Sequence, residues 1–130
     1  DNQVYIDDYA HHPREIEVAI QSARDLHPNK VLTIIFQPHL FTRTRDFMDD
    51  FALALSAADK VMLLGIYPAR ELPITGVSSK VLLEKITCEN KGLYLKSDFP
   101  EAITQTDVLM TLGAGDIDLL IQPIKRHLAS

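Results

Sequence analysis

The sequence predicts an α/β fold: a three-layer, Rossmann-like open sheet of mostly parallel strands with helices on both faces. Two observations carry this prediction. Short β-branched segments alternate with longer segments whose apolar residues recur at helical spacing, and repeated units of this length join parallel strands by right-handed crossovers. The strand-like segments are almost continuously apolar, which is typical of a sheet covered on both faces. With 130 residues, the chain suits one domain over residues 1–130.

The first five elements follow from apolar periodicity and from one proline. Pro13 suits a first helical turn, where its missing N–H costs no hydrogen bond. The run at residues 31–36 is apolar throughout, as in a strand buried on both faces. In order, we expect a strand at residues 4–6, a helix over 13–26, a strand at 31–36, a helix over 44–58 and a strand at 61–66.

The later elements are predicted by capping residues and by shorter apolar runs. Ser78 or Ser79 is expected to cap a short helix, and Asp98 begins a segment with capping-box character. Pro123 lies inside the last helical segment and is expected to kink or interrupt it. In order, we expect a helix ending at residue 86, a strand at 93–95, a short helix from 98, a strand at 108–112 and a helix over 117–128.

Composition narrows the classes of function. Eighteen acidic residues against 13 basic residues leave a net charge of -5, which argues against nucleic acid as a partner. The single cysteine, Cys88, cannot form an internal disulfide; it is expected to be inert near a helix end, and a reducing, cytoplasmic setting is expected. No apolar run approaches the length of a membrane span, so no membrane partner is expected.

Polar and charged side chains gather where the predicted strands end. They follow the first, second, third and fifth strands, at residues 7–13, 37–45, 67–71 and 113–116. Three of the five histidines and three arginines lie in these turns. Because sites in open parallel sheets form beyond the carboxyl ends of the strands, we expect these side chains to converge.

Asp7 and Asp8 are open to two interpretations. Adjacent acids can accept hydrogen bonds from ribose hydroxyls, orient a histidine or hold Mg²⁺, or they can form a solvated turn that caps the next helix. Because neighbouring residues of an extended chain point opposite ways, only one of the two is expected to face a ligand.

The histidines favour substrate contacts over a metal site. Three histidines and an aspartate could bind zinc, and a small metal-dependent hydrolase using Asp7, His11 and His39 is one alternative. The adjacent pair His11 and His12 is poor ligand spacing, however, so we predict no metal ligands. We expect His12 to be bonded locally at the helix start, and His11 and His39 to contact an anionic substrate.

Two arginines fall near an expected helix start, where cations oppose the helix dipole. Such a placement suits a docked carboxylate or phosphate, so Arg43 is expected to bind an anion, whereas Arg45 is expected to be solvated and balanced by nearby aspartates. The turn at residues 113–115 is expected to be a tight strand-to-helix connection rather than an NAD site. No P-loop occurs, so this chain alone is not expected to hold a triphosphate tightly.

Taken together, the turns resemble the C-terminal domain of the Mur ligases. Residues 8–13 look like the family's D-Y-x-H-x-P segment, and residues 36–44 look like F-Q-P-H-x-[FY]-[ST]-R-T; residues 67–71 and 113–117 match in the expected order. The doubled aspartate and doubled histidine resemble the L-alanine-adding branch most closely. A branch that recycles murein tripeptide is the alternative, and Tyr9 favours the alanine branch.

The resemblance implies an ATP-dependent, amide-bond-forming ligase of peptidoglycan precursor synthesis. ATP and Mg²⁺ would convert the UDP-N-acetylmuramate carboxylate to an acyl phosphate, which L-alanine attacks. The chain begins without methionine and enters its first strand at once, which suggests that it was cut from a longer protein. The N-terminal UDP-sugar-binding domain and the central ATPase domain, which holds most magnesium ligands, would be absent, and the fragment alone is expected to be inactive.

The resemblance also implies roles for individual residues. The nucleotide would be contacted by Asp8, with Asp7 as the second candidate. Leu40 stands where some relatives have arginine, which weakens a model with two anion-binding arginines. The catalytic candidates are His11, His39 and Arg43, and the substrate-binding candidates are Tyr9, His11, His39, Arg43 and Arg70. Arg70 and Glu71 could instead be hinge or interface residues. A stand-alone nucleotide- or anion-binding module without chemistry is the competing hypothesis.

Overall fold

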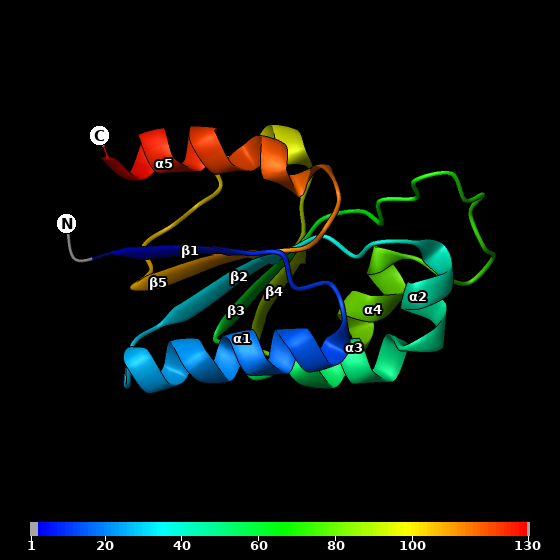
Figure 1. Ribbon diagram of the computed structural model, residues 1–130, viewed down its shortest axis with the longest axis horizontal. Coiled ribbons are helices and arrows are strands. Elements are labelled where there is room, and N and C mark those ends of the chain that lie inside the picture. Colours follow the sequence, from blue (N-terminus) through cyan, green and yellow to red (C-terminus); the bar gives the residue numbers. More distant parts are fainter. Residues whose placement is uncertain (1–2, 130) are drawn as a thin grey trace.

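Five parallel strands form one sheet in the computed structural model, which describes residues 3–129 (Figure 1). The spatial order is β1-β5-β2-β3-β4, and every neighbouring pair is parallel. The strands are β1 (Val4–Asp8), β2 (Leu32–Phe36), β3 (Lys60–Leu63), β4 (Asn90–Leu93) and β5 (Val108–Leu112). Because all five run the same way, their carboxyl ends meet at one edge of the sheet.

Helices cover both faces of this sheet. Figure 1 shows α1, α3 and α4 on one face and α5 on the other. The helices are α1 (Pro13–Leu26), α2 (Phe41–Asp46), α3 (Met48–Leu55), α4 (Ser79–Lys85) and α5 (Ile121–Ala129), with the 3-10 turns η1 (Lys96–Asp98) and η2 (Asp116–Leu120). The predicted three-layer, parallel α/β fold is therefore confirmed.

The central strand β2 shows why the strand segments are apolar throughout. Ile34 and Phe36 pack into the core on the α1 side, and Ile35 packs into the core on the α5 side. All three side chains are fully buried. Burial of each contributes roughly 1.5–3 kcal/mol, so the two faces of a single strand anchor both helical layers.

The predicted helix over residues 44–58 is wrong in one respect, because the structure divides this segment at Phe47. Phe47 has φ -121° and ψ 23°, outside the helical region, and it ends α2 and begins α3. Its ring packs against the ring of His12 at a centroid distance of 4.7 Å. As a result, Arg43 and Arg45 lie in the last turn of a short helix, where the helix dipole favours cations, and not at a helix start.

The edge strand and the final helices also differ from the prediction. Strand β4 covers residues 90–93, not 93–95, and residues 99–102 form a turn instead of a helix. Asp98 accepts a hydrogen bond from the backbone N–H of Leu95 at 2.8 Å, so its capping contact forms around the 3-10 turn η1. The predicted interruption near Pro123 lies earlier, between η2 and α5, and Pro123 occupies the first turn of α5.

Cys88 is buried and unpaired, and its thiol donates to the carbonyl oxygen of Asp59 at 3.0 Å. None of the helices within residues 3–129 has the length and apolar character needed to cross a membrane.

Candidate functional site

Four side chains from two turns converge beyond the carboxyl ends of β1 and β2. Tyr9 and His11 follow β1, and their ring centroids lie 5.3 Å apart. His39 follows β2, and its ring centroid lies 6.1 Å from that of His11. Nη1 of Arg43 lies 2.9 Å from Nδ1 of His39. We call these four residues the histidine cluster; the structure brings together residues that the sequence predicted to converge beyond the carboxyl ends of the strands.

The turn after β2 is held in an unusual backbone conformation. Leu40 has φ 73°, a value that side chains with a Cβ rarely adopt and that costs about 1–3 kcal/mol. Its N–H donates to the carbonyl oxygen of Tyr67 at 2.8 Å, and its carbonyl oxygen accepts from the N–H of Thr44 at 3.1 Å and from its hydroxyl at 2.8 Å. These three bonds fix the turn, so that Arg43 reaches back to His39.

Tyr67, which the sequence did not single out as a separate contact, stacks on His39. Their rings are almost parallel, at 10°, with centroids 5.6 Å apart. Tyr67 also joins its backbone to this turn, because its N–H donates to the carbonyl oxygen of Pro38 at 2.8 Å. A Cβ at Gly115 would lie 2.7 Å from Cγ of Tyr67, so only glycine allows this approach. The glycine turn therefore seats an aromatic ring, and sequence spacing alone carries no signal for that contact.

The bond between Arg43 and His39 determines which nitrogen of His39 carries a proton. A guanidinium can only donate, so Nδ1 of His39 accepts, and the proton of the neutral ring lies on Nε2. Burial, followed by the charges of Arg43 and His11, lowers the pKa of His39 below its ordinary value of 6.5. At neutral pH the cluster therefore presents one fixed cation and one neutral N–H donor, which together suit the oxygen atoms of an anion.

Glu15 fixes the turn that carries His11. Its carboxylate accepts from the backbone N–H groups of His11 at 3.1 Å and His12 at 3.2 Å. The hydrogen bond from the His11 backbone is the largest cause that lowers the pKa of Glu15, so this side chain stays charged. His12 is bonded locally at the helix start, as predicted, through its backbone N–H to Glu15, and its ring packs on Phe47 outside the cluster.

The two adjacent aspartates point in opposite directions, as the strand geometry predicts. Asp7 accepts a hydrogen bond from the hydroxyl of Thr111 at 2.7 Å, whereas Asp8 accepts from the backbone N–H of Ala10 at 2.9 Å. Asp8 and Tyr9 also line a hollow of about 500 Å³ between β1 and α1. No group of three His, Cys, Asp or Glu side chains within residues 3–129 is arranged to bind a metal ion.

Comparison with known proteins identifies the family. The family model described as "Mur ligase, glutamate ligase domain" matches residues 1–121. The chain belongs to the Mur ligase family. The predicted membership is thus confirmed, and the matched range includes all four residues of the histidine cluster.

Relatives of this Mur ligase domain carry one recurring name. The chain is 52% identical over 130 residues to the UDP-N-acetylmuramate–L-alanine ligase of Christiangramia forsetii. The aligned region is 98% of this chain and 29% of that protein. It is 51% identical over 128 residues to the ligase of that name from Porphyromonas gingivalis. Here the aligned region is 96% of this chain and 28% of that protein. The chain thus spans less than a third of the length of these relatives.

Solved structures agree with the fold of this Mur ligase domain. The UDP-N-acetylmuramate–alanine ligase of Thermotoga maritima superposes with a TM-score of 0.72 at 27% identity, over 96% of this chain and 26% of that one. A murein peptide ligase of Psychrobacter arcticus has a TM-score of 0.74 at 17% identity, over 99% of this chain and 28% of that one, which is a likeness of fold alone.

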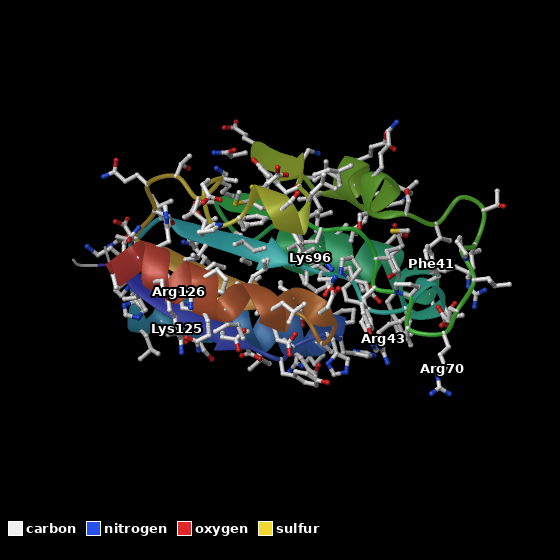
Figure 2. The ribbon with its side chains drawn as sticks, turned by 90° about the horizontal axis from the view of Figure 1, so that it is seen from above. Phe41, Arg43, Arg70, Lys96, Lys125 and Arg126 are labelled. Carbon is white, nitrogen blue, oxygen red and sulfur yellow. The ribbon has the colours of Figure 1, made fainter. Side chains whose placement is uncertain are left out.

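The loop between β3 and α4 supplies one residue that holds the Mur ligase site and one that points away from it. Glu71 accepts from the hydroxyl of Thr42 at 2.5 Å and from its backbone N–H at 3.1 Å, and the hydroxyl bond lowers the pKa of Glu71. Glu71 therefore ties this loop to α2, the helix that carries Arg43. Figure 2 shows Arg70 projecting outward from the loop, beyond Arg43, so the structure does not bring Arg70 into the histidine cluster.

A second group of polar residues lies at the same edge of the sheet, in the turns after β2, β4 and β5. The buried side chain of Gln37 donates to Asp116 at 2.7 Å and accepts from the backbone N–H of Ile117 at 2.9 Å. Asp116 also forms an ion pair with Lys96. Burial opposes ionisation of Asp116, but the bonds from Lys96 and Gln37 outweigh it and lower the pKa of Asp116. We call these residues the Gln37 network; the sequence prediction missed the network because its three side chains come from separate turns.

Proposed function

We propose that this chain is the C-terminal, closing domain of a UDP-N-acetylmuramate–L-alanine ligase, an ATP-dependent enzyme that forms an amide bond in peptidoglycan precursor synthesis. The observation that carries the proposal is the histidine cluster, in which side chains from two Mur ligase motifs form one donor-rich surface. The names of relatives about 50% identical support the choice of reaction. Cytoplasmic location follows from the proposal, since the reaction consumes ATP and a nucleotide sugar.

The missing parts of the reaction belong to the rest of the polypeptide. The relatives are more than three times as long as this chain, which leaves room for a UDP-sugar-binding domain and a central ATPase domain. With no P-loop in the sequence and no metal-binding group within residues 3–129, the central domain is the source of the phosphate contacts and of most Mg²⁺ ligands. Asp8 is the candidate for the ribose contact, and Asp7 is the weaker candidate because its carboxylate already holds Thr111.

The cluster residues act on the charged groups of the reaction. Arg43 holds an anionic group, either the carboxylate of L-alanine or the carboxyl or phosphate oxygens of the reacting intermediate. His39 donates from Nε2 to a neighbouring oxygen. A hydrogen bond to a charged group contributes about 1.5–3 kcal/mol, and more where closure excludes water. Closure of this domain over the other two also protects the acyl phosphate from hydrolysis and aligns the nucleophile.

Two other functions compete with this proposal. A murein tripeptide-recycling ligase would use the same fold, but the murein peptide ligase of Psychrobacter arcticus is only 17% identical to this chain, whereas relatives about 50% identical carry the alanine name. A stand-alone nucleotide- or anion-binding module would use the same donors without chemistry. The absence of a P-loop from the sequence disfavours tight nucleotide binding by the chain alone.

A chimera tests the proposed reaction directly. In it, this chain replaces the matching region, 29% of the length, of the Christiangramia forsetii relative. We expect phosphate release that requires ATP, UDP-N-acetylmuramate and L-alanine together, and we expect none from the 130-residue chain alone. A chimera that folds, by circular dichroism and gel filtration, but releases phosphate only with murein tripeptide, or not at all, would contradict the proposal.

Calorimetry separates the ligase domain from the stand-alone module. ATP is titrated into the isolated chain with and without Mg²⁺. Weak or absent binding is expected of a domain that depends on a central ATPase partner. Tight, magnesium-independent binding would instead support the module.

A further inference from the structure

The two histidines of the cluster have hydrogen-bond partners of opposite character. Nδ1 of His11 lies 2.9 Å from the carbonyl oxygen of Tyr9, which can only accept. Nδ1 of His39 lies 2.9 Å from Nη1 of Arg43, which can only donate. Neutral His11 therefore carries its proton on Nδ1 and a lone pair on Nε2, whereas neutral His39 carries its proton on Nε2.

We propose that His11 accepts the proton from the ammonium group of the incoming amino acid, through Nε2, while His39 donates a hydrogen bond to an oxygen of the acyl group. This inference rests on the proposed function, because it divides the chemistry of that reaction between two residues. An amino acid at neutral pH carries an ammonium group, which has no lone pair and cannot attack a carbonyl carbon. Attack therefore needs a proton acceptor, and of the two cluster histidines only His11 has a ring lone pair that is not already engaged in a hydrogen bond.

The proton and electron balance closes within the reaction itself. One proton moves from the ammonium nitrogen to Nε2 of His11, which leaves a free amine and an imidazolium. The amine lone pair forms the C–N bond at the acyl carbon, and the C–O bond to phosphate breaks with its electron pair on the leaving oxygen. The phosphate carries away a second proton from the attacking nitrogen, and His11 returns its proton to water.

The groups that face His11 suit a proton acceptor. The carboxylate oxygen of Glu15, from α1, lies 3.6 Å from Nδ1 and places a negative charge beside the ring. The ring centroids of Tyr9 and His39 lie 5.3 and 6.1 Å from that of His11, and Arg43 is hydrogen-bonded to His39. The His11 side chain is 27% exposed, so a substrate can reach it.

His39 is unsuited to the same task. Its Nδ1 lone pair accepts from Arg43, and its Nε2 carries the proton of the neutral ring. Tyr67 stacks on the ring and holds its plane, so Nε2–H keeps one direction. Such a group is a fixed hydrogen-bond donor, able to stabilise the negative charge that develops on the acyl oxygen.

The ring protons can be observed without any catalysis. Long-range ¹H–¹⁵N correlation spectra of the 130-residue chain, recorded above pH 7.5, distinguish a protonated from an unprotonated ring nitrogen. We expect the proton of His11 on Nδ1 and the proton of His39 on Nε2. A His11 ring protonated on Nε2 would overturn the proposal, since no lone pair would then face the substrate.

The pH dependence of His11→Gln in the chimera tests the chemical role. Without a proton acceptor, only the small fraction of free amine reacts, and this fraction grows about tenfold per pH unit below the pKa of the amine. The loss in kcat/KM should therefore shrink as pH rises. A loss that stays constant with pH indicates a structural role and would overturn the proposal, as would no loss at all.

His12→Gln is the matched control, because its ring packs on Phe47 outside the cluster. We expect its loss, if any, to be independent of pH. The two proposals fail separately: an unaltered chimera without ligase activity refutes the proposed function, and this inference with it. If the unaltered chimera is active but the loss in kcat/KM caused by His11→Gln does not change with pH, only the proton transfer is refuted.

Discussion

The Gln37 network and the histidine cluster lie at the same edge of one sheet, yet they use polar side chains in opposite ways. In the Gln37 network, whose side chains come from the turns after β2, β4 and β5, each side chain is bonded inside the domain, Gln37 to Asp116 and to the Ile117 N–H, and Asp116 to Lys96. In the histidine cluster, His39 and Arg43 bond to each other. Within residues 3–129, the bonds of the Arg43 guanidinium involve only Nη1, so its other donors remain for a ligand.

The difference separates a polar group that stabilises the fold from one that binds a ligand. Buried polar groups are hydrogen-bonded because an unpaired one costs about 1–3 kcal/mol. Donors that face solvent without a protein partner carry no such penalty, and they keep their capacity to bind. The Gln37 network should therefore control stability, and the histidine cluster should control turnover.

The largest effect expected from this contrast is the loss of turnover in Arg43→Ala. Removal of a donor aimed at a developing or bound anion typically lowers the rate by about 10²–10³-fold. The chimera should show that loss in kcat/KM, while the unfolding midpoint of the isolated chain changes little. Arg45→Ala is the control, because Arg45 is exposed and paired with Asp46 on the surface; its effect should stay within about threefold. Equal losses in the two variants would contradict the contrast.

Gln37→Leu should lower the stability of the fold, whereas Arg43→Ala should lower turnover. The change leaves the N–H of Ile117 without its acceptor and takes one donor from Asp116. We expect unfolding free energy to fall by about 2 kcal/mol, measured by urea denaturation of the chain, or by a fall in Tm on the order of 8 °C. Gln21→Leu, at an exposed amide on α1, should change stability by less than about 0.5 kcal/mol. A fully stable Gln37→Leu chain would show that the network is not structural.

The sequence could predict the histidine cluster far better than the Gln37 network. Tyr9, His11, His39 and Arg43 are polar residues in turns after apolar strands, and parallel strands necessarily bring such turns to one edge. That argument needs only the order of the elements. The helix break at Phe47 was missed because apolar periodicity continues through it.

The Gln37 network could not be predicted from local patterns. Gln37, Lys96 and Asp116 come from three turns separated by 20 to 79 positions. Each is an ordinary turn residue by itself, and only the register of β2 against β5 makes them meet. Tyr67 was missed for the same reason, since its stacking on His39 follows from a parallel bridge between two loops.

A smaller effect is expected when pH changes the stability of the fold. It arises at His39, whose surroundings in the histidine cluster lower its pKa. Burial first, and then Arg43 and His11, lower this pKa in the folded chain, whereas the unfolded chain keeps the ordinary value of 6.5. Between the two values the unfolded state binds more protons, so stability is complete above pH 6.5 and falls as pH drops toward the folded pKa. Urea denaturation between pH 5 and 7.5 should show this fall in the unaltered chain and a shallower one in His39→Gln. Identical slopes would mean that His39 is not held neutral by its surroundings.

The smallest effect is expected at Arg70, where the sequence predicted a substrate contact and the structure turns the side chain outward (Figure 2). Arg70→Ala removes an exposed guanidinium that supports no part of the fold, so stability should change by less than about 0.5 kcal/mol. If closure of the full-length enzyme brings Arg70 to the substrate, it contributes a uniform binding contact, and KM for L-alanine should rise a few-fold with kcat unchanged. Glu71→Gln provides the comparison, because it weakens the link to Thr42 and should lower kcat by disturbing α2 and Arg43. A wild-type KM in Arg70→Ala would remove Arg70 from the substrate site, and the loop would then act on the reaction only through Glu71.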